Sequence, residues 1–184
     1  MSSLTEQLAV TLANYNTASS LIYGIGNVGR QDDGLGWAFI DWLEAESVCP
    51  KAELMRHYQL HLEDADLISY KKQVLFVDAT KAADVESFHL EKVAPKMDFS
   101  FSSHAISIPA IMHTCFQCFE KVPEVQLLTI KGYEWELQLG LTSMAKQNMD
   151  ASTTFFRQQS LFNNSGVTDE KMSWMHPYFA LPLR

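Results

Sequence analysis

Three side chains that lie far apart in the sequence have the chemistry of a metal site. They are Asp33, Asp78 and His104. Asp33 follows a predicted strand, Asp78 closes a strongly apolar segment, and His104 precedes a predicted helix. Two carboxylates and one imidazole suit a divalent transition metal that keeps open coordination positions. The spacing alone leaves an alternative, because an Asp at a strand end often caps a turn and a lone His often has a structural role.

The segments around these residues alternate between strand and helix patterns. The run Gln73–Val77 is apolar apart from its first residue, which is typical of a central strand buried on both faces, whereas Val85–Val93 alternates moderately, as an edge strand does. Further strands are expected at Ser20–Ile25, Ala52–Tyr58 and Val125–Ile130. Helices are expected over Ser3–Asn16, Gly34–Glu46, His61–Tyr70 and Ser107–Glu120, and from a capping Thr142 to about Gln159.

This order of elements predicts an α/β fold, a three-layer helix–sheet–helix sandwich with a mainly parallel twisted sheet. Ligands of such sheets bind outside the carboxyl ends of the strands. Asp33, Asp78 and His104 all fall at that rim of the predicted sheet. The topology therefore predicts that side chains separated in the sequence come together in space.

A glycine-rich loop, Gly24-Ile-Gly26-Asn-Val-Gly29, follows the first expected strand. Its spacing matches a dinucleotide-binding turn, in which the N-terminus of the next helix holds a pyrophosphate. Here Asp32 and Asp33 come before the helix, and two carboxylates repel a pyrophosphate. A loop that only turns tightly is the favoured interpretation, and a dinucleotide-binding oxidoreductase stays open as an alternative.

A second short motif, Cys115-x-x-Cys118, falls in the middle of an expected helix. A zinc ribbon needs a second cysteine pair, and a redox motif places its first Cys at a helix N-terminus. Core packing is therefore the favoured interpretation, and His113 on the same helix leaves a metal site as a weaker alternative. The sequence has no Gly-x-Ser-x-Gly motif for a serine nucleophile.

Composition narrows the possible partners of the chain. It has 184 residues, of which 47% are hydrophobic and 20% charged, and its formal net charge is −8. This length suits one domain with a sizeable core. The acidic balance argues against nucleic acid or an anionic membrane as a partner, and no apolar run reaches the roughly 18 residues of a membrane span. We expect a cytoplasmic protein, because the first residues lack a signal-peptide pattern and three cysteines are too few for a disulfide framework.

Four sequence blocks together resemble the [NiFe]-hydrogenase maturation endopeptidases. In that family an apolar strand leads into Gly-x-Gly-Asn and a short loop, followed by an acidic pair, a Gly and a helix. The family also has an apolar strand that ends in Asp-Ala, and a His before the next helix. The matching blocks are Leu21–Gly36, Gln73–Ala79, His104–Ser107, and Leu127–Gly132 together with Trp135–Leu137 and Gly140–Thr142. The fourth block is similar to the branch that serves soluble multisubunit hydrogenases.

The resemblance implies both an activity and a set of site residues. The family cuts a short C-terminal peptide from the precursor of the hydrogenase large subunit after nickel has been inserted. Matched by motif, the family's metal ligands fall on Asp33, Asp78 and His104, the trio that the rim position also selects. The resemblance further implies nickel supplied by the substrate precursor and no organic cofactor. Asp32 would position the ligand loop or assist proton transfer.

The resemblance covers about residues 20–159 of the one expected domain, with residues 1–19 as an extension and 160–184 as an irregular tail. Inside it, Val28, Gly29 and Gln31 stand where the family more often has Pro, Leu and Gly. The resulting interpretation is a hydrogenase maturation protease. An alternative of a different class is a nickel-dependent checkpoint protein or chaperone that binds the precursor without cutting it. The sequence does not indicate the oligomeric state.

Overall fold

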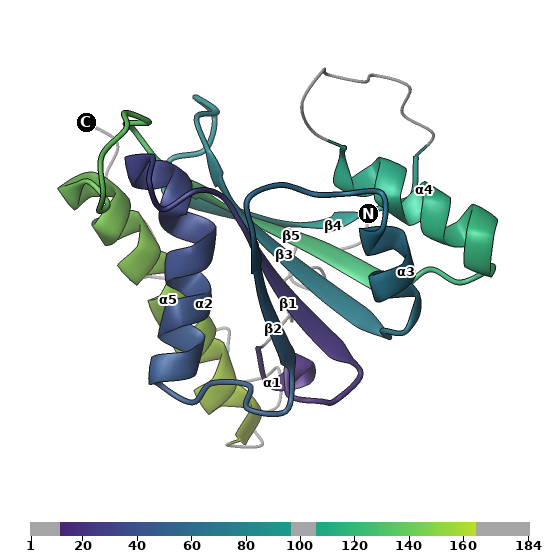
Figure 1. Ribbon diagram of the computed structural model, residues 1–184. Helices are drawn as coiled ribbons and strands as arrows, with labels where there is room; N and C mark the ends of the chain where they lie inside the picture. The colour runs from purple at the N-terminus through teal and green to yellow at the C-terminus, as the bar shows by residue number, and fades with distance from the viewer. Residues whose placement is uncertain (1–11, 97–105, 165–184) are drawn as a thin grey trace.

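A twisted five-stranded sheet forms the centre of the part of the chain that the structure describes (Figure 1). The structure is a computed structural model, and it describes residues 12–96 and 106–164. In the sheet the strands follow the order β2-β1-β3-β5-β4, and β4 at the edge is antiparallel to β5 while the other pairs are parallel. The strands are β1 (Ser20–Ile25), β2 (Glu53–His57), β3 (Gln73–Thr80), β4 (Phe88–Val93) and β5 (Glu124–Lys131).

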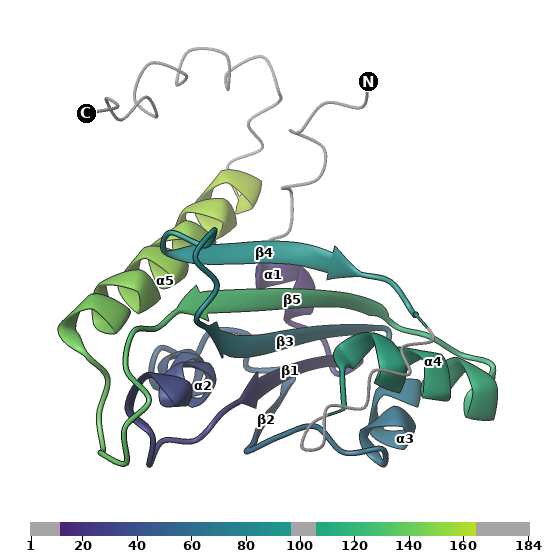
Figure 2. The same ribbon diagram turned by 90° about the horizontal axis from the view of Figure 1, so that it is seen from above.

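Helices cover both faces of the sheet, so the predicted three-layer α/β sandwich is confirmed (Figure 2). One face carries α1 (Leu12–Tyr15), α2 (Leu35–Ala45) and the long α5 (Ser143–Asn164). The other face carries α3 (Asp64–Ser69) and α4 (Ile108–Phe119). Figure 2 shows the carboxyl ends of β1, β3 and β5 at one rim of the sheet. A short 3-10 turn, η1 (Gln31–Gly34), connects that rim to α2.

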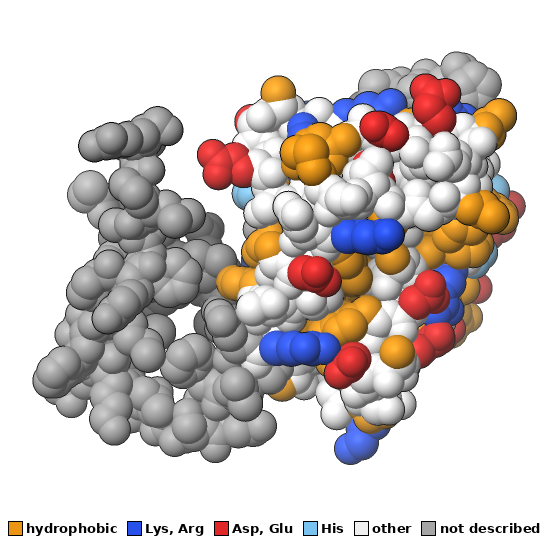
Figure 3. All heavy atoms as spheres, turned by 90° about the vertical axis from the view of Figure 1, so that its left-hand side faces the viewer, with side chains coloured by type: hydrophobic (Ala, Val, Ile, Leu, Met, Phe, Trp, Pro, Cys, Tyr) orange, Lys and Arg blue, Asp and Glu red, His pale blue; other side chains and the backbone are white. Residues whose placement is uncertain are grey.

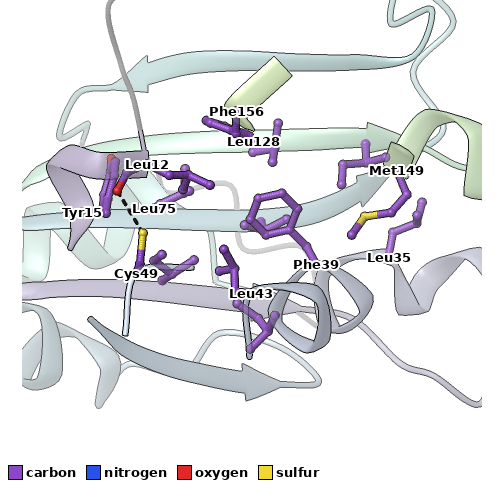
Figure 4. Close-up of a cluster of buried hydrophobic side chains, with 14 of the residues drawn as sticks. Leu12, Tyr15, Leu35, Phe39, Leu43, Cys49, Leu75, Leu128, Met149 and Phe156 are labelled. Carbon is purple, nitrogen blue, oxygen red and sulfur yellow. Dashed lines mark hydrogen bonds between the residues drawn. The ribbon is translucent and has the colours of Figure 1, made fainter. Parts of the chain in front are cut away.

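Alternating side chains of the central strands build the two cores. Ile22 and Leu75 face α2 and α5, whereas their neighbours Tyr23 and Phe76 face α3 and α4, and all four are fully buried. This period of two follows from the pleat of a strand, and burial on both faces explains the continuous apolar runs. Figure 4 shows the first core, in which the thiol of Cys49 donates a hydrogen bond of 2.9 Å to the carbonyl of Leu12.

Two glycines let the start of α2 lie directly on the sheet. A Cβ atom on Gly36 would meet the carbonyl oxygens of Ile25 at 2.2 Å and of Val77 at 2.6 Å. A Cβ atom on Gly24 would meet the carbonyl oxygen of Gly36 at 2.5 Å. The absence of side chains at both positions brings the helix against the ends of β1 and β3, and so places η1 at the rim.

Most expected elements are present, and a few boundaries differ. The third strand continues through Asp78 to Thr80, because it pairs with β5 as far as Thr80 and Lys131, so Asp78 lies within the strand instead of ending it. The last helix continues to Asn164 and not to about Gln159. Of the expected first helix, only α1 lies in the described part; residues 1–11, the expected loop at 97–103 and residues 165–184 of the tail lie outside it.

The surface over α2 and α5 mixes charged and apolar side chains (Figure 3). Acidic and basic groups alternate on this face, and neither forms a continuous patch in the view. Across residues 12–96 and 106–164, no helix is long and apolar enough to cross a bilayer.

Candidate functional site

A pocket of about 330 Å³ opens at the carboxyl ends of the parallel strands, and both predicted carboxylate ligands line it. Asp33 comes from η1 and Asp78 from β3, so one strand and one turn bring them together. The rest of the lining is mostly apolar, with contributions from the end of β1, the segment after β2 and the start of α4. These lining residues are Ile25, Gly26, Tyr58, Gln59, Leu60, Ile106, Ser107 and Ile108.

Asp78 is the carboxylate whose protonation the site perturbs most clearly. Burial raises the pKa of Asp78 to about 7, and the negative charge of Asp33 adds to this increase. The N–H of Ala79 donates to Oδ1 of Asp78 at 2.8 Å and acts in the opposite direction, because it stabilises the ionised form. The effect of Asp33 requires the two carboxyl groups to lie near each other. Two neighbouring carboxylates of which one resists ionisation are stabilised when they share a proton or a cation.

The backbone that carries Asp33 is tightly folded against the glycine-rich loop. Gly26 has φ of +135°, and a Cβ atom there would lie 1.8 Å from the carbonyl oxygen of Asp33. That same carbonyl accepts a hydrogen bond of 3.1 Å from the N–H of Asn27. Only glycine fits at position 26, so the first residues of the Gly-rich motif serve to place Asp33 beside the pocket.

Asp32, the other member of the acidic pair, is fully buried and is absent from the pocket lining. Its Oδ2 accepts hydrogen bonds from the N–H groups of Tyr133 (2.8 Å) and Glu134 (3.1 Å) and from the hydroxyl of Thr142 (2.8 Å). Its Oδ1 accepts from the N–H of Thr142 at 2.7 Å. Burial alone would raise the pKa of Asp32, but these hydrogen bonds outweigh it and the net pKa is lowered. The contacts favour the interpretation that Asp32 positions its loop.

Gln31 completes the connection between η1 and the loop that joins β5 to α5, residues 132–142. It has φ of +48°, a left-handed conformation that is uncommon for a residue with a side chain. Its amide Nε2 donates to Glu134 Oε2 at 3.0 Å, its Oε1 accepts from the N–H of Glu136 at 3.1 Å, and its N–H donates to the carbonyl of Gln138 at 2.8 Å. These bonds offset the conformational cost, which is about 1 kcal/mol.

Trp135 is a site residue that the search for chemical groups missed. Its indole Nε1–H donates to Oδ1 of Asp33 at 3.2 Å, although the two residues are 102 positions apart in the sequence. Trp135 belongs to one of the blocks that carry the family resemblance, and this was the feature of the sequence that could have indicated a role at the site. For Gln31 the signal was a side chain where the family more often has Gly.

The third predicted ligand, His104, lies outside the described residues. Ile106 and Ser107, two and three positions further along the chain, line the pocket. The Ser107 hydroxyl also accepts a hydrogen bond of 3.3 Å from the N–H of Ala110 and caps α4. Within residues 12–96 and 106–164, no three His, Cys, Asp or Glu side chains are grouped so that they could hold a metal ion. The triad with His104 therefore stays a prediction.

The two remaining motifs have structural roles in the described part of the chain. Cys115 is buried and donates to the carbonyl of Lys121 at 3.0 Å, as the core interpretation expects, but Cys118 is exposed and lies outside the core. In the glycine-rich loop, Gly24 lies within β1 against Gly36, and α2 begins only after η1. A pyrophosphate at this loop would meet acidic side chains before it met a helix N-terminus.

Comparison with solved structures relates this fold to known proteins. The hydrogenase maturation protease HycI of Thermococcus kodakarensis superposes with a TM-score of 0.58 at 18% identity, over 79% of this chain and 90% of the other. The hydrogenase maturating endopeptidase HybD of Escherichia coli superposes with a TM-score of 0.57 at 15% identity, over 80% and 93%. For the solution structure of Escherichia coli HycI, an endopeptidase, the TM-score is 0.55 at 17% identity, over 82% and 95%.

These similarities define the class of fold: the chain has the fold of the hydrogenase maturation proteases, as the sequence blocks implied. Identities below 20% define a fold and not a branch of the family, so the likeness to the branch serving soluble hydrogenases stays a prediction. No protein-family model matches the sequence, and no curated protein matches it.

Proposed function

We propose that this protein is an endopeptidase that removes a C-terminal peptide from the precursor of a [NiFe]-hydrogenase large subunit after nickel insertion. The observation that carries the proposal is the carboxylate pair Asp33 and Asp78, which lines one pocket at the carboxyl rim of a sheet with the maturation-protease fold. Fold alone does not define a function, because function depends on the site that the fold supports. Here the fold and the chemistry of the site support the same activity.

The chemistry of the pocket suits recognition of a metal ion that arrives with the substrate. Asp33 and Asp78 would bind the nickel of the precursor, with His104 as the third ligand. Asp78 is held where burial disfavours its charge, so a bound cation would favour its ionised form. Binding of a metal already seated in the precursor docks the nearby peptide bond in the pocket.

The cut itself requires an activated carbonyl and a nucleophile. A divalent metal polarises a carbonyl oxygen, or lowers the pKa of bound water toward 7. In this chain Asp33 and Asp78 would hold the metal, and through it the scissile bond, beside the apolar wall formed by Leu60 and Ile108. Asp32 contributes by fixing the backbone on which Asp33 lies.

Processing by single-site variants tests this proposal. We expect His104→Ala, Asp33→Asn and Asp78→Asn to lose at least about 100-fold in the rate of precursor cleavage while they remain folded. The matched controls are His89→Ala on the edge strand and Asp150→Asn on α5, whose side chains are exposed and do not line the pocket. A folded His104→Ala protein that cuts the precursor at the wild-type rate would show that the triad is assigned wrongly.

A nickel-dependent checkpoint protein is the main alternative, because the same ligands could bind the precursor without cutting it. The two functions differ in turnover: a protease at substoichiometric concentration converts excess precursor, whereas a checkpoint protein retains one precursor per molecule. A dinucleotide-dependent oxidoreductase is less well supported, because Asp32 and Asp33 separate the glycine-rich loop from α2.

A further inference from the structure

The indole of Trp135 is confined on several sides next to Asp33. Its Nε1–H donates to Asp33 Oδ1 at 3.2 Å. The ammonium of Lys81 lies 4.3 Å from the centre of its ring, a cation–π contact that favours one ring orientation. A Cβ atom on Gly132 would approach the ring to 2.7 Å, so the ring lies directly against the backbone of Gly132.

The donor and the acceptor of this hydrogen bond also sit in one hydrogen-bonded frame. The N–H of Asp32 donates to the carbonyl of Glu134 at 3.1 Å, and the N–H of Glu136 donates to Gln31 Oε1 at 3.1 Å. The residues on either side of Trp135 are therefore bonded to the residues that precede Asp33. With both backbones fixed to each other, the indole N–H meets the carboxylate at a set position.

This geometry restricts the Asp33 carboxylate, which would otherwise rotate about its Cβ–Cγ bond. A hydrogen bond to Oδ1 restricts this rotation, and none of the residues that the structure describes donates to Oδ2. Asp33 lines the same pocket as Asp78, so the orientation of its carboxylate decides where it offers an oxygen to a ligand. Hydrogen bonds from outside the coordination sphere orient metal ligands in this way, and their loss costs roughly 10–100-fold in affinity or activity.

We propose that Trp135 is a positioning residue that holds the Asp33 carboxylate in its working orientation through the indole N–H. The inference rests on the proposed protease function. It adds Trp135 to the proposed active site as a residue that orients Asp33 and takes no part in the reaction itself. The ring alone does not suffice, because only the N–H contacts the carboxylate. Because Asp33 would bind the nickel that the precursor carries, loss of this hydrogen bond would lower kcat/KM for the cut.

Replacement by Phe tests the role of the N–H, because Phe keeps an aromatic ring at this position but has no donor. It also loses the indole atoms Cζ2 and Cη2 that lie against Gly132, so the control must be a Trp→Phe change as well. We expect Trp135→Phe to lower kcat/KM for precursor cleavage about 10–100-fold. The control is Trp42→Phe, because the indole N–H of Trp42 is buried without a hydrogen-bond partner among the described residues. This control should cleave within twofold of wild type. Equal kcat/KM in Trp135→Phe and wild type overturns the proposal and leaves the protease function intact.

A spectroscopic measurement tests the same contact without any cleavage. In a ¹H–¹⁵N spectrum, the indole signal that is lost in Trp135→Phe identifies Trp135. We expect Asp33→Ala to shift that signal and to speed its exchange with solvent at least about tenfold, whereas Asp33→Asn, which keeps Oδ1, leaves exchange within about threefold. If Asp33→Ala changes neither the position of the indole signal nor its exchange rate, the proposal is wrong. If wild-type protein cuts no precursor, the protease function fails, and this signal still decides whether Trp135 holds Asp33.

Discussion

The same substitution, Asp to Asn, should affect different properties of the protein at the two neighbouring acids Asp32 and Asp33. Asp32 is fully buried and accepts four hydrogen bonds that connect η1 to the loop before α5. Asp33 lines the pocket, and the side-chain bond described for it comes from Trp135 to Oδ1. Asp32→Asn should therefore reduce stability, whereas Asp33→Asn should reduce activity.

The cost of Asp32→Asn follows from the hydrogen-bond geometry. In its better orientation, the new amide places its oxygen at Oδ2, where it still accepts from Tyr133, Glu134 and the Thr142 hydroxyl. The NH₂ group then points at the N–H of Thr142, which donated at 2.7 Å, so two donors oppose each other in a buried place. One charged hydrogen bond is lost and one buried N–H is left unpaired, which costs about 3 kcal/mol in total.

Urea unfolding of wild type, Asp32→Asn and Asp33→Asn at pH 7 measures this difference. A thermal melt of the same proteins should agree, because about 3 kcal/mol corresponds to a drop of roughly 6–12 °C in Tm for a chain of this length. Asp33→Asn should unfold within about 1 kcal/mol of wild type, because an Asn oxygen also accepts from Trp135. The reasoning is refuted if Asp32→Asn is as stable as Asp33→Asn.

The pH dependence of the same pair provides an internal check. The pKa of Asp32 is lowered in the folded protein, so its stabilisation is complete above the unfolded pKa and is lost as the pH falls through the folded value. The difference in unfolding free energy between wild type and Asp32→Asn should therefore be constant near neutral pH and narrow only below about pH 4.

Three further predictions concern the pocket, the helix α2 and the glycine-rich loop. Asp78→Asn should stabilise the protein at pH 8 by about 1–3 kcal/mol, because the raised folded pKa of about 7 makes Asp78 cost stability. This cost builds up between the unfolded pKa and about pH 7, where the unfolded state is ionised and the folded state is protonated, and it is complete above about pH 7. Denaturant unfolding should show the gain shrinking toward about pH 4, and a gain that grows toward acid pH contradicts it. Gly36→Ala should cost at least about 3 kcal/mol or prevent folding, because its Cβ would lie 2.2 Å from the Ile25 carbonyl; a wild-type melting temperature would show that α2 is not held this closely. Millimolar dinucleotide should leave tryptophan fluorescence unchanged, and a saturable response would revive the oxidoreductase alternative.

The fold was predictable because its strongest signals are local. Runs such as that of β3 are apolar on both faces of the strand, which occurs where helices cover a parallel sheet on each side. The predicted end of β3 came too early in the sequence. The strand continues to Thr80 because it pairs with β5, and β5 begins more than 40 residues later, where no local pattern in β3 can reveal it. Cys118 was assigned to the core with Cys115, but a helix buries one face, and positions three apart can straddle its edge.

The candidate site was predictable only where a topological rule applied. The carboxyl ends of parallel strands share one rim, and this rule selected Asp33 and Asp78, which do line one pocket. The role of Trp135 depends on the path of a loop 102 residues further along the chain, and no local pattern encodes that path. The support that Gln31 receives likewise comes from residues 134–138.

The most direct test of the central claim is the mass of a nickel-loaded large-subunit precursor before and after incubation with a substoichiometric amount of this protein. A nickel-free precursor of the same sequence is the control. The proposed function predicts complete loss of a C-terminal peptide from the nickel-loaded precursor and no loss from the control. An unchanged mass of the nickel-loaded precursor contradicts the protease function, and equal cleavage of both precursors contradicts the metal trigger.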